Sequence, residues 1–170
     1  MALNVAHYFN QIGCFNDILN YQVSYNEIRT IREALKLDID GFIINGLLSF
    51  SASINSLNNN NCSWAFIQSY YSIFFFARAF NGINDYAIVY NNKTPYAIKI
   101  QPLEKFSKMS GNSHDVVLNQ FKNSLGNDVL LTSDIENLNP VEWFNKSRNF
   151  INYALNPQTD PISPMNLYSY

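Results

Sequence analysis

The stretch that decides the fold is SWAFIQSYYSIFFFARAF, residues 63–80. Its apolar side chains occupy nearly the whole circumference of a helix, so the pattern predicts a helix from Trp64 to about Asn81, ended by Gly82. Such a helix lies at the centre of a domain or half in an interface. Its apolar part, residues 64–80, is about 17 residues long and contains Arg78, so it is at the lower limit for crossing a membrane. We therefore predict a core helix and no membrane association.

The rest of the chain predicts further helices and one hairpin. Apolar residues recur at helical spacing in residues 5–19, with an interruption near Gly13, and again in 26–36, 38–57, 113–125 and 139–156. Asn139 followed by Pro140 is a strong start signal for the last of these helices, and Ser113 or His114 starts the one before it. Two short β-branched and aromatic runs around NNKT, within residues 85–100, predict a small β-hairpin.

These patterns predict a mainly α fold, a bundle of four to six helices with a small inserted β-hairpin. At 170 residues the chain is long enough for one core without disulfides or metals. We expect a single helical domain over residues 1–156. Residues 157–170 contain several prolines and are expected to form an extended tail.

Composition excludes several classes of function. The chain has 11 basic and 13 acidic residues and a net charge of -2, so it lacks the basic footprint of a DNA-binding protein, and no DNA partner is expected. Cys14 and Cys62 are far apart and indicate reduced thiols of a cytoplasmic protein, and the first residues contain no secretory signal. His7 and His114 are the only histidines, so we expect neither a metal site nor a cofactor.

The segment SRNFINYALN, residues 147–156, contains the side chains that are candidates for chemistry. Asn149 and Tyr153 are four residues apart and share a helix face. Arg148 lies about 140° around the axis from Tyr153, at the other edge of the same polar strip. The alternative is an ordinary packed helix, with Arg148 as a hydrogen-bonding anchor and Tyr153 at the edge of the core.

Two of the predicted helices resemble those of HEPN domains. SWAFIQSYYSIFFFARAF resembles the aromatic helix of that family, and WFNKSRNFINYALN resembles its late motif helix. The resemblance implies a small helical bundle, commonly dimeric, of the kind found in prokaryotic toxin–antitoxin and antiviral systems. The family motif is an Arg, four to six residues, and then a His, often with a polar residue directly after the Arg. Arg148 and Asn149 match this motif, but Tyr153 stands where the His is expected.

This replacement bears on catalysis. Active members of the family resemble metal-independent endoribonucleases, in which a 2′-hydroxyl attacks the neighbouring phosphate, and a histidine can shuttle the proton near neutral pH. The pKa of a tyrosine, near 10, would have to fall by about three, at a cost of roughly 4 kcal/mol. A neutral tyrosine can still bond a phosphate or stack on a base. His114 is a further, weak candidate for the missing proton shuttle.

Three hypotheses follow. The first is a dimeric HEPN-like module that binds protein or RNA in a toxin–antitoxin or antiviral context and has little or no catalytic activity. The second is a metal-independent endoribonuclease that uses Arg148, Asn149 and Tyr153, with or without His114, in a dimer cleft. The third is a structural helical subunit of a larger complex, in which Arg148 is paired inside its own subunit. We expect a homodimer through the aromatic and motif helices, because apolar side chains all round the aromatic helix need a cover.

Overall fold

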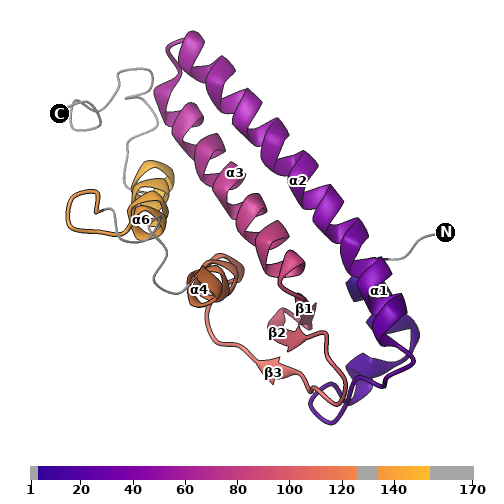
Figure 1. Ribbon diagram of the computed structural model, residues 1–170. Coiled ribbons are helices and arrows are strands. Elements are labelled where there is room, and N and C mark those ends of the chain that lie inside the picture. The colour runs from indigo at the N-terminus through magenta and orange to yellow at the C-terminus, as the bar shows by residue number, and fades with distance from the viewer. Residues whose placement is uncertain (1–3, 126–133, 154–170) are drawn as a thin grey trace. The chain divides into compact units, whose positions relative to one another are not determined.

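The computed structural model describes residues 4–125 and 134–153, and it is mainly helical with a small antiparallel sheet (Figure 1). The predicted fold class is thereby confirmed. The expected tail, residues 157–170, and the expected last residues of the final helix lie outside the described residues. The helices are α1 (Val5–Gln11), α2 (Ile28–Asn58), α3 (Cys62–Ile83), α4 (Ser113–Leu125) and α6 (Pro140–Tyr153), and the strands are β1 (Tyr86–Asn91), β2 (Thr94–Lys99) and β3 (Ser107–Lys108).

The chain forms two compact units. The first unit comprises Met1–Ile43 and Phe76–Ser124, and the second comprises Ile44–Phe75 and Leu125–Tyr170. Both long helices, α2 and α3, contribute residues to each unit. The expectation of a single domain over residues 1–156 stays a prediction.

The long helix α2 replaces two predicted helices. The sequence pattern separated residues 26–36 from 38–57, but α2 continues without interruption from Ile28 to Asn58. The apolar row of Ile31 and Leu35 continues directly into the second segment, and no proline lies between the two. Gly41 remains inside the helix, where one glycine costs only about 1 kcal/mol relative to alanine.

The aromatic helix α3 is close to its prediction, but Gly82 has a different role. The helix ends at Ile83, so Gly82 lies inside its last turn. A Cβ atom on Gly82 would lie 2.6 Å from Cγ1 of Ile39 on α2. Because carbon atoms in contact are about 3.5–4.0 Å apart, the glycine is needed for close packing of two helices.

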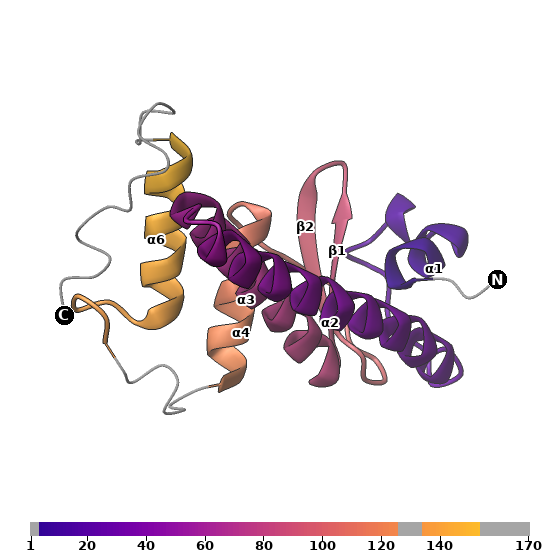
Figure 2. The same ribbon diagram turned by 90° about the horizontal axis from the view of Figure 1, so that it is seen from above.

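The core of the first unit lies between α1, the sheet and the first part of α2. Phe9 is completely buried, and its ring makes edge contacts with the rings of Tyr21 and Phe106 at centroid distances of 5.7 and 5.0 Å. α1 lies beside β1 (Figure 2). Gly13, at φ +72°, ends the first helical segment, as the interruption in the pattern predicted. Other buried members of this core are Val5, Ile31, Leu35, Ile98 and Ile100.

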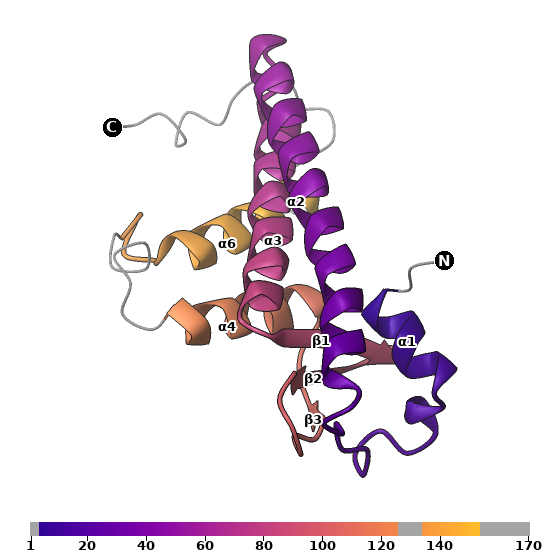
Figure 3. The same ribbon diagram turned by 45° about the vertical axis from the view of Figure 1, so that its right-hand side comes forward.

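The predicted β-hairpin is formed by β1 and β2. Tyr90 pairs with Pro95 and Asn91 with Thr94, which leaves Asn92 and Lys93 as a two-residue turn. Both turn residues have positive φ, 48° and 67°, as a type I′ turn requires. A short third strand, β3, pairs with β2 and gives the order β1-β2-β3 (Figure 3). With only two residues, β3 was too short for the alternation pattern to predict.

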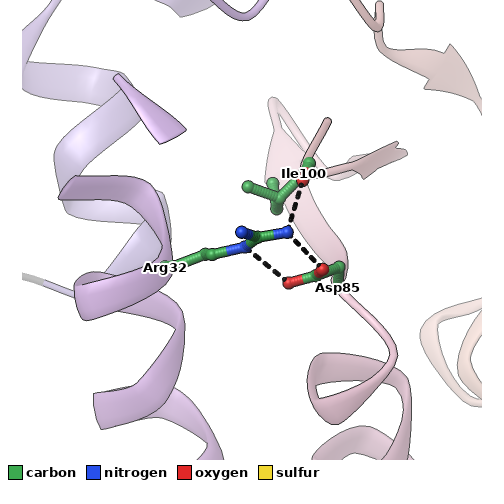
Figure 4. A network of polar contacts seen from close by, with 3 residues as sticks. All are labelled: Arg32, Asp85 and Ile100. Carbon is green, nitrogen blue, oxygen red and sulfur yellow. Dashed lines mark hydrogen bonds and ion pairs between the residues drawn. The ribbon is translucent and has the colours of Figure 1, made fainter. Parts of the chain in front are cut away.

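An ion pair joins α2 to the junction between α3 and β1. Nε and Nη2 of Arg32 donate to the two carboxylate oxygens of Asp85 at 3.0 and 2.6 Å, and Nη2 also reaches the carbonyl oxygen of Ile100 at 3.5 Å (Figure 4). Asp85 has φ +63°, a conformation that aspartate tolerates better than most residues. The pair therefore holds the chain at the point where helix changes to strand.

The two predicted helix starts after the hairpin are confirmed. Asn139 Oδ1 accepts a hydrogen bond from the backbone N–H of Glu142 at 3.0 Å, and Pro140 is the first residue of α6. α4 begins at Ser113, and Oδ1 of Asn112 accepts from the backbone N–H groups of His114 and Asp115.

Within the described residues, one helix is long and apolar enough to cross a membrane, and it is α2 instead of the aromatic helix. Only 11% of its most apolar 18-residue window is buried. Burial among residues 4–125 and 134–153 therefore does not explain the apolar character of α2.

Candidate functional site

The aromatic and motif helices, α3 and α6, pack against each other in the second unit. The Phe66 ring lies 5.3 Å from the Trp143 ring and 5.2 Å from the Phe144 ring, measured between centroids. The Tyr70 side chain is buried, and its hydroxyl donates to Oδ1 of Asn145 at 3.4 Å. These contacts fix the motif helix on the aromatic helix of the same chain.

The structure brings Arg148 and Asn149 together. Nη1 of Arg148 donates to Oδ1 of Asn149 at 2.9 Å, and its guanidinium carbon lies 5.5 Å from the centre of the Tyr70 ring. This distance is within the range of a cation–π contact. Asn149 is exposed, and Arg148 is half-buried. The guanidinium therefore makes a hydrogen bond and a ring contact inside its own subunit.

The other two candidates are placed separately. Tyr153 is the last residue of α6, and its side chain lies outside the described part of the chain. His114 belongs to α4 in the first unit. Their participation with Arg148 in a proton transfer stays a prediction.

A second group of polar side chains, which the sequence reasoning missed, lies in the first unit. Asp38, Arg78 and Asn81 line a cavity of about 30 Å³ together with apolar residues of α1, α2 and β1. The guanidinium of Arg78 lies 4.0 Å above the ring of Phe42. Asp38 Oδ2 accepts a hydrogen bond from the backbone N–H of Val5 at 3.2 Å. The sequence signal that could have indicated this group is Arg78, a charged residue within the apolar pattern of the aromatic helix.

Burial shifts the pKa values of the two charged side chains at this cavity. Burial raises the pKa of Asp38, although the Val5 N–H and the Arg78 cation act in the opposite direction. Burial also lowers the pKa of Arg78, opposed by Tyr90 and Asp38. Asn81 is 1% exposed, and its Nδ2 donates to the carbonyl oxygen of Val117 at 3.1 Å, whereas its Oδ1 finds no donor within the described residues. A cavity of this size has room for a water molecule that satisfies such an acceptor, and it is too small for a substrate.

A third polar group stabilises the loop before α2. The Glu27 carboxylate accepts hydrogen bonds from the Tyr21 hydroxyl at 2.9 Å, the Tyr8 hydroxyl at 3.3 Å and the Ser24 N–H at 3.0 Å. Burial acts to raise the pKa of Glu27, but the hydrogen bonds that the carboxylate accepts together have the larger effect. The pKa of Glu27 is therefore lowered. Burial, with the neighbouring Glu27 charge, raises the pKa of Tyr8 to about 12. The group is a structural anchor, since Tyr8, Tyr21 and Ser24 all donate to the one carboxylate of Glu27.

The second half of α2 exposes large apolar side chains in the second unit. We call this set the outer face of α2; each member is between 44% and 63% exposed. The opposite side of the same helix segment has small residues instead: Oγ of Ser53 lies 2.6 Å from Oγ of Ser69, and the Ser72 hydroxyl donates to the carbonyl oxygen of Gly46 at 2.9 Å. The outer face consists of Ile44, Leu47, Leu48, Phe50, Ile54 and Leu57.

Across residues 4–125 and 134–153, no three His, Cys, Asp or Glu side chains gather in a group that could hold a metal ion. The two cysteines, both in the described part of the chain, do not form a disulfide. Burial, followed by the charge of Glu27, raises the pKa of Cys14 to about 12, so that thiol stays protonated at neutral pH. Compared with known proteins, the chain matches no family model, no curated protein and no solved structure.

Proposed function

We propose that this chain is a helical binding module that acts by association with a protein and not by cleavage of RNA. The observation that supports the proposal best is the outer face of α2. Six large apolar side chains that are each about half exposed form a patch larger than scattered surface residues would give, and such patches mark interaction sites.

The charge distribution agrees with this proposal. Residues 41–77 include no Asp, Glu, Lys, Arg or His, so the outer face lies in a long uncharged stretch. An RNA cleft gathers basic side chains around the backbone of its ligand, because phosphate contacts dominate the affinity. Lys146 and Arg148 are the cations of α6, and the guanidinium of Arg148 lies over Tyr70. A protein surface of apolar character therefore fits the outer face better than RNA does.

The resemblance of α3 and α6 to HEPN helices suggests the biological setting. A binding module of that kind belongs in a prokaryotic toxin–antitoxin or antiviral system, where it pairs with a second copy or with another component of the system. A cytoplasmic location is part of the same proposal. Packing of Arg148 inside its own subunit and the tyrosine at position 153 both favour binding over catalysis.

A ribonuclease assay of the purified full chain tests the absence of catalysis. The wild type, Arg148→Ala and Tyr153→Phe are incubated with a mixed RNA pool in EDTA, and all three are expected to leave the RNA intact. Cleavage by the wild type that both variants lose would overturn the proposal and support the nuclease hypothesis. Cleavage that all three retain would point to a contaminating nuclease, so each preparation is repeated after a second purification step.

Binding of an apolar fluorescent dye, anilinonaphthalene sulfonate, tests the binding surface. At dilutions where the chain is monomeric, we expect dye fluorescence from the wild type and a clear loss with Leu47→Glu. Lys36→Glu, a change of charge at another exposed position of α2, is the matched control and should leave the fluorescence unchanged. Equal fluorescence of all three proteins would contradict an accessible apolar surface at the outer face.

A further inference from the structure

The outer face of α2 has the spacing of a helix-pairing surface. Leu47 and Ile54 are seven residues apart, and so are Phe50 and Leu57. A seven-residue repeat of apolar side chains keeps one seam of a helix directed at a second helix, with each side chain inserted between those of the partner. The occupant that fits this face is therefore another helix with an apolar, uncharged surface.

The side of α2 toward α3 explains why the large residues point outward. Gly46 and Ser53 are buried, and the Ser56 hydroxyl donates to Oε1 of Gln68 at 2.9 Å. Small side chains let two helices approach closely, and their hydroxyl bonds satisfy the polar groups between them. The contact with α3 therefore uses the small residues and leaves the apolar ones for a different partner.

The outer face is complementary to itself in an antiparallel arrangement. If two copies of α2 cross at a twofold axis between Phe50 and Ser51, Ile44 lies opposite Leu57 of the partner subunit, and Leu47 lies opposite Ile54 of the partner subunit. At the axis, the large Phe50 lies opposite the small Ser51 of the partner subunit, which relieves crowding at the centre. This symmetry is what an isologous dimer requires, since the same patch serves both protomers.

We propose that the outer face of α2 is the contact surface of a homodimer, in which α2 of one protomer packs antiparallel against α2 of a second copy. This inference rests on the proposed binding function, names its partner, and places the dimer contact on α2 in place of the aromatic and motif helices that the sequence led us to expect. Six half-exposed side chains present on the order of 600 Å² of apolar surface, and neighbouring serine and asparagine residues extend it toward the roughly 800 Å² per partner of a stable interface. A second copy supplies an apolar, uncharged helix segment of matching length, the second half of its own α2, without any further component.

The test uses sedimentation velocity and light scattering of the full chain, with four variants. The wild type is expected at twice the chain mass of 19.5 kDa. Leu47→Glu and Ile54→Lys are each expected to weaken the dimer by more than about a hundredfold, because each places a charge opposite an apolar side chain. The combined variant Leu47→Glu/Ile54→Lys should recover the dimer, and Lys36→Glu should behave like the wild type.

Recovery in the combined variant is specific for the antiparallel arrangement. The two introduced charges of opposite sign face each other across the twofold axis, whereas in a parallel pair equal charges would meet. Recovery shows that the combined variant is folded, and the helical circular dichroism of each single variant checks that it is folded too. A combined variant that stays monomeric while each single variant is folded would overturn the antiparallel pairing, and single variants that stay dimeric would overturn the proposed surface.

Two further outcomes separate this inference from the proposed function. A wild type that is monomeric at its highest soluble concentration, but binds the dye at the outer face, would overturn the homodimer and leave the binding function in place. A monomer that does not bind the dye would overturn both. Flotation of the wild type with neutral phosphatidylcholine vesicles, lost in Leu47→Glu, would assign the outer face to a lipid surface and also overturn the homodimer.

Discussion

Replacing Gly82 with alanine tests the packing between the end of α3 and the first part of α2. The new Cβ atom would lie 2.6 Å from Cγ1 of Ile39, about 1 Å inside the normal contact distance. Overpacking of this kind costs about 1–3 kcal/mol. The higher helix propensity of alanine returns at most about 1 kcal/mol, and less here because α3 ends at Ile83. We expect a net loss of about 1–2 kcal/mol in the free energy of unfolding.

Gly41→Ala is the matched control. Gly41 lies inside α2, and a Cβ atom there would have no neighbour within 4 Å. Only the propensity gain remains, so we expect stabilisation by about 0.5–1 kcal/mol. Urea unfolding followed by the helical circular dichroism signal measures both changes. The corresponding melting temperatures should move in opposite directions, by about 2–4 °C for each kcal/mol.

A double variant identifies the cause of the loss. Ile39→Ala removes the atom that the new Cβ meets, so Gly82→Ala should cost less in the Ile39→Ala background than in the wild type, with a coupling of about 1 kcal/mol. If Gly82→Ala stabilised the protein as much as Gly41→Ala does, the explanation of Gly82 by close packing would be refuted, and the glycine would have no role beyond its place in the last turn.

Two further predictions concern pH. Glu27→Gln is expected to lower the free energy of unfolding by about 1–2 kcal/mol at neutral pH, because the carboxylate accepts hydrogen bonds from Ser24 and Tyr21. Folding lowers the pKa of Glu27 below its ordinary 4.5, so this contribution is complete above that pH and is lost as the pH falls through the folded value. Urea unfolding should show wild type and variant converging as the pH falls below the folded pKa of Glu27, and a difference that grows on acidification would refute the reasoning. Arg78→Met is expected to destabilise by roughly 2–4 kcal/mol at neutral pH, because it leaves the Asp38 carboxylate buried without its cation. Since the folded pKa of Asp38 is raised, the penalty should be smallest below the unfolded value near 4 and grow as the pH rises through the folded value, which unfolding at acid and neutral pH measures.

The elements of the fold followed from local signals where those signals were strong. The Asn139–Pro140 start of α6 and the hairpin around NNKT depend on the chemistry of a few neighbouring residues, and both were predicted. The continuity of α2 and the role of Gly82 were not predicted. Each depends on contacts with residues distant in the sequence, such as Ile39, and spacing alone does not contain that information.

The candidate site, too, was predicted only in part from the sequence. The sequence correctly placed Arg148 and Asn149 on one helix, but it gave no indication that Tyr70 lies under the guanidinium, because the two residues belong to different helices. The cluster of Asp38 and Arg78 was missed for the same reason. The outer face of α2 belongs to the apolar pattern that the sequence shows in residues 38–57, but such a pattern does not tell whether the stripe faces the core or a partner. Only the small residues that pack on α3, among them Ser53, reveal that the stripe points outward.

The contact between α3 and α6 can form only late in synthesis of the chain. Asn145, which accepts the hydrogen bond of the Tyr70 hydroxyl, follows Tyr70 by 75 residues. At a translation rate of 5–20 residues per second, the aromatic helix leaves the ribosome about 4–15 s before the helix that covers it exists. During that interval its phenylalanine-rich surface is open to other nascent chains. Production of this protein is therefore expected to depend on chaperones that bind apolar segments, and slower translation should lower its soluble yield.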